Sequence, residues 1–307
     1  MTTTGARASD WLDRWYEPQW AVGWAYARVL WVIAATFQYG LDVFSIPDVW
    51  GAPDLHFVAG GYRLARYVVL TPPGAYLWWS SIMLTIAAVA VGGRTTKAAW
   101  TLFLVLTWGW LAYEAANVKA HDRLLLFVTL ALLLGPTNER GLATKRRSPF
   151  ARWVMMSVFS AAYGTTGMWK FWHEPTWLTD GSVLANHLVQ PFHGSRPLGV
   201  WLSGQAWLLP ALTIATVAWE CAFPVLIWFK RATAPLLVVG VIFHTTLLLT
   251  MNLGPFALVA FAAYPVLLHP DDMMRLHLAL FRRRRPKRPD PRCVTPRRHG
   301  PAPTTPT

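Results

Sequence analysis

We single out six ionisable side chains that lie inside or at the ends of long apolar stretches of this sequence, where charge is expensive to bury. A charged residue at the centre of a membrane helix costs roughly 2.5–3.5 kcal/mol on insertion scales. Such residues usually face a protein interior or a water-filled cavity, so they are the first candidates for chemistry. They are Arg28, Glu114, His121, Lys170, Glu220 and His244.

Lys170 has two interpretations. At the end of an apolar stretch, its ammonium could simply reach the lipid headgroups. Alternatively it is a general base, because a poorly solvated ammonium gives up its proton and the neutral amine can then remove a proton from a substrate. Its neighbours in the sequence are all apolar: Met168, Trp169, Phe171 and Trp172.

His121 and His244 are candidate proton carriers, because imidazole titrates near neutral pH. His121 precedes a leucine-rich stretch and stands beside Asp122, which could equally pair with it or cap the following helix. His244 lies deep in an apolar run after Phe243, and if buried it needs a hydrogen-bond partner. A packing role therefore stands beside the catalytic one for both histidines.

Arg28 and Glu220 carry opposite charges in two different apolar stretches. The simpler interpretation is an ion pair between helices, and the alternative is that either one binds a ligand.

We predict no metal site. Four potential ligands share one loop, but their spacing does not match two histidines one helical turn apart with an intervening glutamate. A glycine-rich phosphate loop and a Gly-x-Ser-x-Gly elbow are also missing from the sequence, so nucleotide and serine-hydrolase chemistry have no support. The four loop residues are His173, Glu174, His187 and His193.

The composition predicts the elements that hold these residues. Of 307 residues, 54% are hydrophobic and 14% are charged, against roughly 25% charged in a typical soluble protein. This excludes a soluble enzyme or a cytosolic nucleic-acid binder. The net charge of +13 comes from short loops and from the tail that begins at Arg282, a pattern that in membrane proteins reports topology and anionic lipid. The two cysteines, Cys221 and Cys293, do not suggest a disulfide framework.

We therefore predict an all-α fold, a polytopic bundle of about eight transmembrane helices in the cell membrane. The fourth and eighth stretches are shorter than the ~20 residues that cross a bilayer, so each is tilted, longer than its apolar core, or re-entrant. The predicted spans are Trp20–Phe37, Gly74–Val91, Ala98–Ala115, His121–Leu134, Ala151–Lys170, Trp207–Phe229, Pro235–Leu253 and Phe256–Leu268.

The positions of lysine and arginine predict the orientation, with both termini in the cytoplasm. The basic loops at 94–97, 145–147 and 230–231 then all face inward, while the segments at 42–54, 117–122, 171–205 and 252–255 face outward. The predicted divisions are a cytoplasmic segment (1–19), a transmembrane domain (20–270) and a basic, proline-rich cytoplasmic tail (271–307), largely disordered because it has too few apolar residues to fold.

One stretch has a spacing of residues that also occurs in a known protein family. Tyr163, Gly167 and Lys170 form a Tyr-x-x-x-Gly-x-x-Lys pattern, followed by Trp177 and Gly181. This resembles the horizontally transferred transmembrane (HTTM) family, which contains the membrane domain of vitamin K-dependent gamma-carboxylase. Further features occur in the family's order over about residues 20–270: Arg28, His121 before leucines, Glu220 before Pro224, and His244 before Gly254-Pro255-Phe256.

The resemblance implies a chemistry. In the carboxylase, the lysine matching Lys170 deprotonates reduced vitamin K, oxygenation of that hydroquinone produces a strong base, and carbon dioxide adds to the deprotonated glutamate. The implied cofactor is a vitamin K-like hydroquinone, with oxygen and carbon dioxide. Two departures limit the transfer: Trp169 stands where the animal enzyme has a second lysine, and the large extracytoplasmic domain of that enzyme is missing.

The leading hypothesis is thus a membrane enzyme with an outward-facing cavity for a lipid-soluble or peptide substrate. Its catalytic residues would be Lys170, His121 and His244. The alternative is a non-catalytic membrane protein that binds lipid or quinone or escorts a partner, and a transporter is third, because paired broken helices are not evident. Convergence of the three catalytic candidates in one cavity would favour the enzyme. The candidate substrate-binding residues are Arg28, Glu220, Tyr163 and Trp177.

Overall fold

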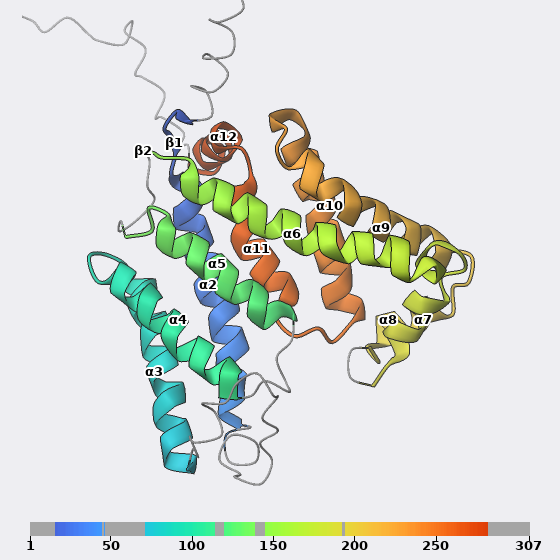
Figure 1. Cartoon of the computed structure of the whole chain (residues 1–307), viewed down its shortest axis with the longest axis horizontal. Helices are drawn as coiled ribbons and strands as arrows, with labels where there is room; N and C mark the ends of the chain where they lie inside the picture. Colours follow the sequence, from blue (N-terminus) through green and yellow to red (C-terminus); the bar gives the residue numbers. More distant parts are fainter. Residues whose placement is uncertain are drawn as a thin grey trace, which may run out of the picture.

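The computed structural model describes residues 16–44, 46, 71–113, 120–138, 145–191 and 194–281. Within these ranges the chain is almost entirely helical, as predicted (Figure 1). Glu114, His193, most of the predicted outer segment 42–54 and the basic tail from Arg282 lie outside the described residues.

Each of the eight predicted apolar stretches is a helix, with bounds that differ by a few residues from the prediction. Among the described residues, three helices (α3, α9 and α10) are long and apolar enough to cross a membrane, and α11 is apolar but shorter. The chain therefore has the helices of a membrane protein. The eight are α2 (Val22–Gly40), α3 (Pro72–Val91), α4 (Thr96–Tyr113), α5 (Ala120–Leu134), α6 (Phe150–His173), α9 (Leu209–Leu226), α10 (Lys230–Thr250) and α11 (Phe256–Leu267).

The remaining elements are short, and most lie in connections between the long helices. The stretch Pro270–Phe281 forms α12, although the sequence assigned nearly all of it to the tail. Its first turn carries Asp271 and Asp272, which stabilise a helix N-terminus, and it packs against α2 and β1. The others are β1 (Gln19–Trp20), η1 (Leu41–Phe44), β2 (Arg146–Arg147), η5 (Pro175–Leu178), α7 (Ser182–Val189) and α8 (Pro197–Ser203).

Small residues let the two most extensive helix pairs, α2 with α11 and α6 with α9, approach closely. A Cβ atom at Gly23 of α2 would clash with the backbone carbonyl of Pro265 in α11. In the same way, a Cβ atom at Gly167 of α6 would lie 2.9 Å from the backbone nitrogen of Cys221 in α9. Close approach of helix backbones at small residues is how membrane helices gain packing contacts without a hydrophobic driving force.

The basic connections gather at one end of the bundle (Figure 1). Strand β1 pairs antiparallel with β2, which brings the segment before α2 to the loop that contains Arg146 and Arg147. Arg28 donates to the carbonyl oxygen of Thr137, and Lys97 donates to the carbonyl oxygen of Gly135. Three basic connections that are far apart in the sequence are thus joined by hydrogen bonds, as expected if they share one side of a membrane.

The other connections meet at the opposite end. The side-chain amide of Gln38, near the end of α2, donates to Asp122 at the start of α5 over 2.7 Å. His121 lies against Gly254, in the turn between α10 and α11. The short helices α7 and α8 also lie at the far end of α6 and α9 from the basic loops (Figure 1).

Candidate functional site

Lys170 is paired with Glu220. Its ammonium, in the last turns of α6, donates to both carboxylate oxygens of Glu220 on α9, over 2.7 and 2.8 Å. The lysine side chain is 18% exposed and the glutamate side chain 7%. Gly167, one turn earlier on the same face, lets α6 lie against α9 and so brings the two charges within reach. The Gly-x-x-Lys spacing therefore has a structural reason.

The apolar neighbours of Lys170 in the sequence do not enclose it, which corrects the expectation above. Successive residues on a helix point about 100° apart. Met168, Trp169, Phe171 and Trp172 are all exposed in this structure. Lys170 points instead toward α9, and its environment is set by residues distant in the sequence.

Trp177 of η5 covers the ammonium. The Lys170 nitrogen lies 4.6 Å from the centre of the indole ring, a cation–π contact. The indole N–H of Trp177 donates to Glu174 over 2.8 Å, which fixes the ring. Gly181, with φ of 75°, follows in the left-handed conformation, and a Cβ atom there would lie 2.6 Å from the Cβ of Leu209. The Trp177 and Gly181 positions thus attach this loop to the start of α9.

His244 is fully buried, and both of its ring nitrogens have partners. Its Nδ1 lies 2.8 Å from the carbonyl oxygen of Gly240 and 3.0 Å from the hydroxyl of Tyr264. Its Nε2 lies 3.0 Å from the hydroxyl of Tyr163. If Nδ1 carries the hydrogen and donates to Gly240, Nε2 accepts from Tyr163. The hydrogen-bond partners expected for a buried histidine are therefore the hydroxyls of two tyrosines.

The two groups of polar residues adjoin. Tyr163 and Lys170 are seven positions apart, on the face of α6 that meets α9. Trp219, next to Glu220, packs against Tyr163 with ring centres 4.7 Å apart and against His244 at 5.9 Å. We call Lys170, Glu220, Tyr163, His244 and Tyr264 the polar cluster. Sequence reasoning missed Tyr264, although a hydroxyl within the last apolar stretch was a signal for it.

His121 and Arg28 lie elsewhere. His121 is 3.7 Å from the carboxylate of Asp122 and contacts Gly254, and Arg28 bonds the carbonyl oxygen of Thr137 at the basic end. The expected ion pair between Arg28 and Glu220 is not formed, because Glu220 binds Lys170.

Three of the four loop residues that were weighed as metal ligands have other partners. His173 stacks on Trp169, Glu174 accepts from two indoles, and His187 bonds the carbonyl oxygen of Val183. Among the described residues, no three histidine, cysteine, aspartate or glutamate side chains form a group suited to a metal ion.

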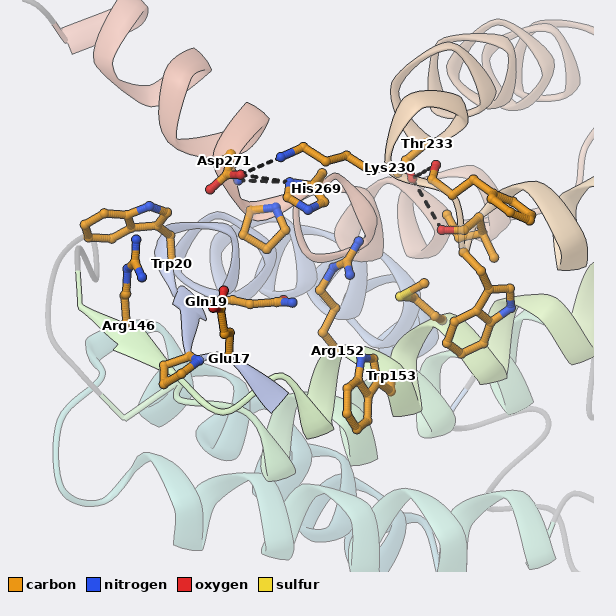
Figure 2. A pocket seen from close by; sticks show the side chains of 16 residues that line it. Glu17, Gln19, Trp20, Arg146, Arg152, Trp153, Lys230, Thr233, His269 and Asp271 are labelled. Carbon is orange, nitrogen blue, oxygen red and sulfur yellow. Dashed lines mark hydrogen bonds and ion pairs between the residues drawn. The ribbon is translucent and has the colours of Figure 1, made fainter. Parts of the chain in front are cut away.

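Two cavities lie near opposite ends of the molecule. An apolar pocket of about 190 Å³ lies between α7, α8, α9 and α10, and Trp219 forms part of its wall. A larger cavity of about 820 Å³ lies at the basic end (Figure 2). Lys170, His121 and His244 line neither of them. Lys170 and His244 therefore share a cluster, but the three candidates do not meet in one of these cavities.

Comparison of the chain with protein-family models, with characterised proteins and with solved structures finds no match. Membership of the HTTM family stays a prediction from the residues. Part of the pattern nevertheless has a physical role here, because Gly167 and Gly181 permit the contacts that hold Lys170 between Glu220 and Trp177.

Proposed function

We propose that this chain is a multi-pass membrane enzyme of the HTTM type that exchanges a proton with an apolar substrate at Lys170 and Glu220. The observation that carries the proposal is the ion pair itself, a lysine bonded to both oxygens of a mostly buried glutamate between two apolar helices. Removing two charges from water is costly, and replacing such a pair by apolar residues is often neutral or stabilising. A pair retained in this setting is more readily explained by function than by stability.

The pair can supply a base without a net change of charge. Transfer of one proton from the Lys170 Nζ to the Glu220 carboxylate leaves an amine and a carboxylic acid, which are less costly to bury than two ions. The amine can then accept a proton from a substrate hydroxyl. His244, held between Tyr163 and Tyr264, is the candidate for passing that proton onward.

The apolar pocket supports an apolar substrate. Its wall consists mainly of aliphatic and aromatic side chains, including Leu188, Leu202 and Phe243, and it adjoins the polar cluster through Trp219. An apolar ring or chain fits such a lining. When bound, a reduced quinone supplies an acidic hydroxyl, and the resemblance adds oxygen and carbon dioxide as co-substrates for a carboxylation.

We propose eight spans, cytoplasmic termini and an outward-facing polar cluster in the cell membrane.

The test uses Lys170→Arg, which keeps a long cationic side chain but cannot give up its proton. Lipids and secreted peptides from cells with the wild-type gene, the variant and no gene are compared by mass spectrometry, with attention to oxidised quinones and to a carboxyl increment. We expect a product that depends on the gene and disappears in Lys170→Arg at unchanged protein level. Lys97→Arg, at the basic end, is the matched control. A fully active Lys170→Arg variant would end the proposal.

A non-catalytic role is the second candidate, and one observation favours it: neither cavity is lined by Lys170 or His244. In that case the pocket holds a lipid or quinone, and the Lys170–Glu220 pair only joins α6 to α9. The same comparison separates the two functions, since a binding protein retains a quinone during purification without changing its chemistry.

A further inference from the structure

The larger cavity, about 820 Å³, is built from four separate parts of the chain at the basic end of the bundle. The segment around β1, the start of α6, the α9–α10 connection and the α11–α12 connection all line it. In Figure 2, Arg152 lies in the middle of the lining side chains, with Lys230 and His269 above it and Gln19 to its left. The polar cluster lies elsewhere in the molecule and contributes no residue to this cavity.

Arg152 is a buried cation without an acidic partner among the described residues. It is 8% exposed. Its guanidinium donates to two backbone carbonyls of α11, with Nε to Val266 over 3.1 Å and Nη2 to Leu267 over 3.0 Å. Five N–H donors are available on an arginine, so donors remain beyond these two bonds. Buried charges are normally paired, and an anion in the cavity would provide the missing partner.

Gln19 is a second lining residue to which a ligand can bond, and it needs a hydrogen-bond donor. The oxygen of its side-chain amide is buried and accepts no hydrogen bond within the described residues. Because a buried acceptor without a donor costs roughly 1–3 kcal/mol, a hydroxyl group on the ligand would stabilise the site. The cavity thus provides one donor group for an anion and one acceptor for a hydroxyl.

The charged side chains of the lining leave an excess of one positive charge, because Arg146, Arg152 and Lys230 stand against the carboxylates of Glu17 and Asp271. Lys230 is bonded to Asp271 over 2.7 Å, so these two cancel, and Arg146 stacks over Trp20 with its charge unpaired by any described carboxylate. His269 adds no charge at neutral pH, because burial and the nearby cations lower its pKa to about 4.

Most of the remaining lining is apolar. It includes Trp153, Met156, Ile227, Trp228 and Phe229, and Phe229 is also exposed on the outer surface of the molecule. An apolar wall that continues to the outside suits an acyl chain, whereas a free phosphate ester would leave it in contact with water. A basic pocket between helices on the cytoplasmic side is also where anionic headgroups bind membrane proteins.

We infer that this cavity binds an anionic phospholipid, with the phosphate on Arg152, a headgroup hydroxyl on Gln19 and an acyl chain along the apolar wall. Phosphatidylglycerol has all three features. Phosphatidylmethanol lacks the hydroxyl, phosphatidylcholine lacks the net negative charge, and soluble glycerol phosphate lacks the chains. Binding of these four ligands to the purified full-length protein in detergent is measured by native mass spectrometry.

Phosphatidylglycerol is expected to bind ~10-fold or more tightly than phosphatidylcholine and a few-fold more tightly than phosphatidylmethanol. Arg152→Gln should remove ~10-fold or more of the phosphatidylglycerol affinity. Gln19→Met should abolish the preference over phosphatidylmethanol without weakening phosphatidylmethanol itself. Arg94→Gln, which removes a charge at the same end but outside the cavity, is the matched control and should change neither.

Unchanged binding in Arg152→Gln, or an equal loss in Arg94→Gln, would mean that lipid is held by general charge alone and would overturn the inference. Equal affinity for soluble glycerol phosphate would overturn the lipid as the source of the phosphate. Because Arg152 also holds α11, failure of Arg152→Gln to fold is one outcome, so unfolding temperature is recorded for each protein. In that case Gln19→Met decides the matter, and an unchanged lipid preference in this variant rejects the site.

Discussion

At the residue scale, the buried polar groups hold one another: Lys170 donates to both oxygens of Glu220, and His244 lies between the hydroxyls of Tyr163 and Tyr264. The sequence indicated Lys170, Glu220 and His244 as candidate site residues, because an ionisable group in an apolar stretch is costly to bury. Glu220 was assigned to Arg28, yet it binds Lys170. Pairing depends on which helices are neighbours and at what depth, and neither follows from the order of residues along the chain.

His244 gives a prediction at this scale. If it passes a proton between Tyr163 and Tyr264, His244→Ala should reduce the rate of product formation by ~10²–10⁴-fold. His121→Ala should have a much smaller effect, because His121 contacts Asp122 and Gly254 rather than the polar cluster. Product is measured by the mass-spectrometric comparison above and divided by the amount of folded protein, since His244→Ala also leaves two buried hydroxyls without their partner. Equal effects of the two variants would contradict this assignment.

At the element scale, long apolar stretches predicted helices reliably, because a twenty-residue apolar run has few other ways to satisfy its backbone. The shorter elements η5, α7, α8 and α12 were missed. Their sequences are too short for a clear period, and contacts with α2, α9 and α10 stabilise them. Arg152 was also missed as a candidate, although it lies inside the predicted span Ala151–Lys170, next to its first residue.

Gly167 tests the contact between α6 and α9. In Gly167→Ala the new Cβ atom would lie 2.9 Å from the backbone nitrogen of Cys221, so the helices must separate. We expect a loss of roughly 1–3 kcal/mol of stability and a weaker Lys170–Glu220 pair. Gly164→Ala on the same helix is the control, since its Cβ would meet only the side chain of Pro224, with Cγ at 3.3 Å and Cβ at 3.6 Å. Thermal unfolding in detergent compares the two, and equal unfolding temperatures would show that close approach at Gly167 is unimportant.

The α11–α12 junction predicts a dependence on pH. His269 faces Lys230, Arg152, Asp271 and Asp272, and burial is the main cause that lowers its pKa from 6.5 to about 4. Between these values the unfolded chain binds a proton that the folded chain does not. The contribution of His269 to the free energy of unfolding is therefore at its full value above about pH 6.5. It is lost as the pH falls toward 4, with a slope of at most about 1.4 kcal/mol per pH unit.

Unfolding temperature measured from pH 7.5 to 4.5 tests this expectation. His269→Gln should flatten the decline over that range. His277→Gln is the matched control, because His277 lies on α12 but bonds Tyr26 instead of facing the same charges, and it should leave the decline in place. An equally steep decline in His269→Gln would locate the dependence in another group.

At the scale of the whole molecule, the charge pattern predicted that the basic connections share one side of the membrane, and hydrogen bonds in the structure join three of these connections. β1 with β2, Arg28 with Thr137, and Lys97 with Gly135 join the basic connections to one another. Gln38 with Asp122 joins two connections at the other end. The grouping follows from alternation, since each helix that crosses the bundle returns the chain to the opposite end. Which end faces the cytoplasm is a separate property, set during insertion by lysine and arginine.

Cysteine labelling of the full-length protein determines that orientation. In a background with Cys221→Ser and Cys293→Ser, single cysteines are introduced by Thr95→Cys and Ser148→Cys at the basic end and by Thr179→Cys in the loop between α6 and α7, all at exposed positions. A membrane-impermeant maleimide should label Thr179→Cys on intact cells, whereas the other two should react only after permeabilisation. The reason is that each basic connection resists translocation, and the described ones lie at one end of the bundle. Labelling of Ser148→Cys on intact cells would reverse the orientation and would put the polar cluster on the cytoplasmic side. An identical pattern at Thr95→Cys and Thr179→Cys would instead reject the eight-span arrangement, because these positions would then share one side of the membrane.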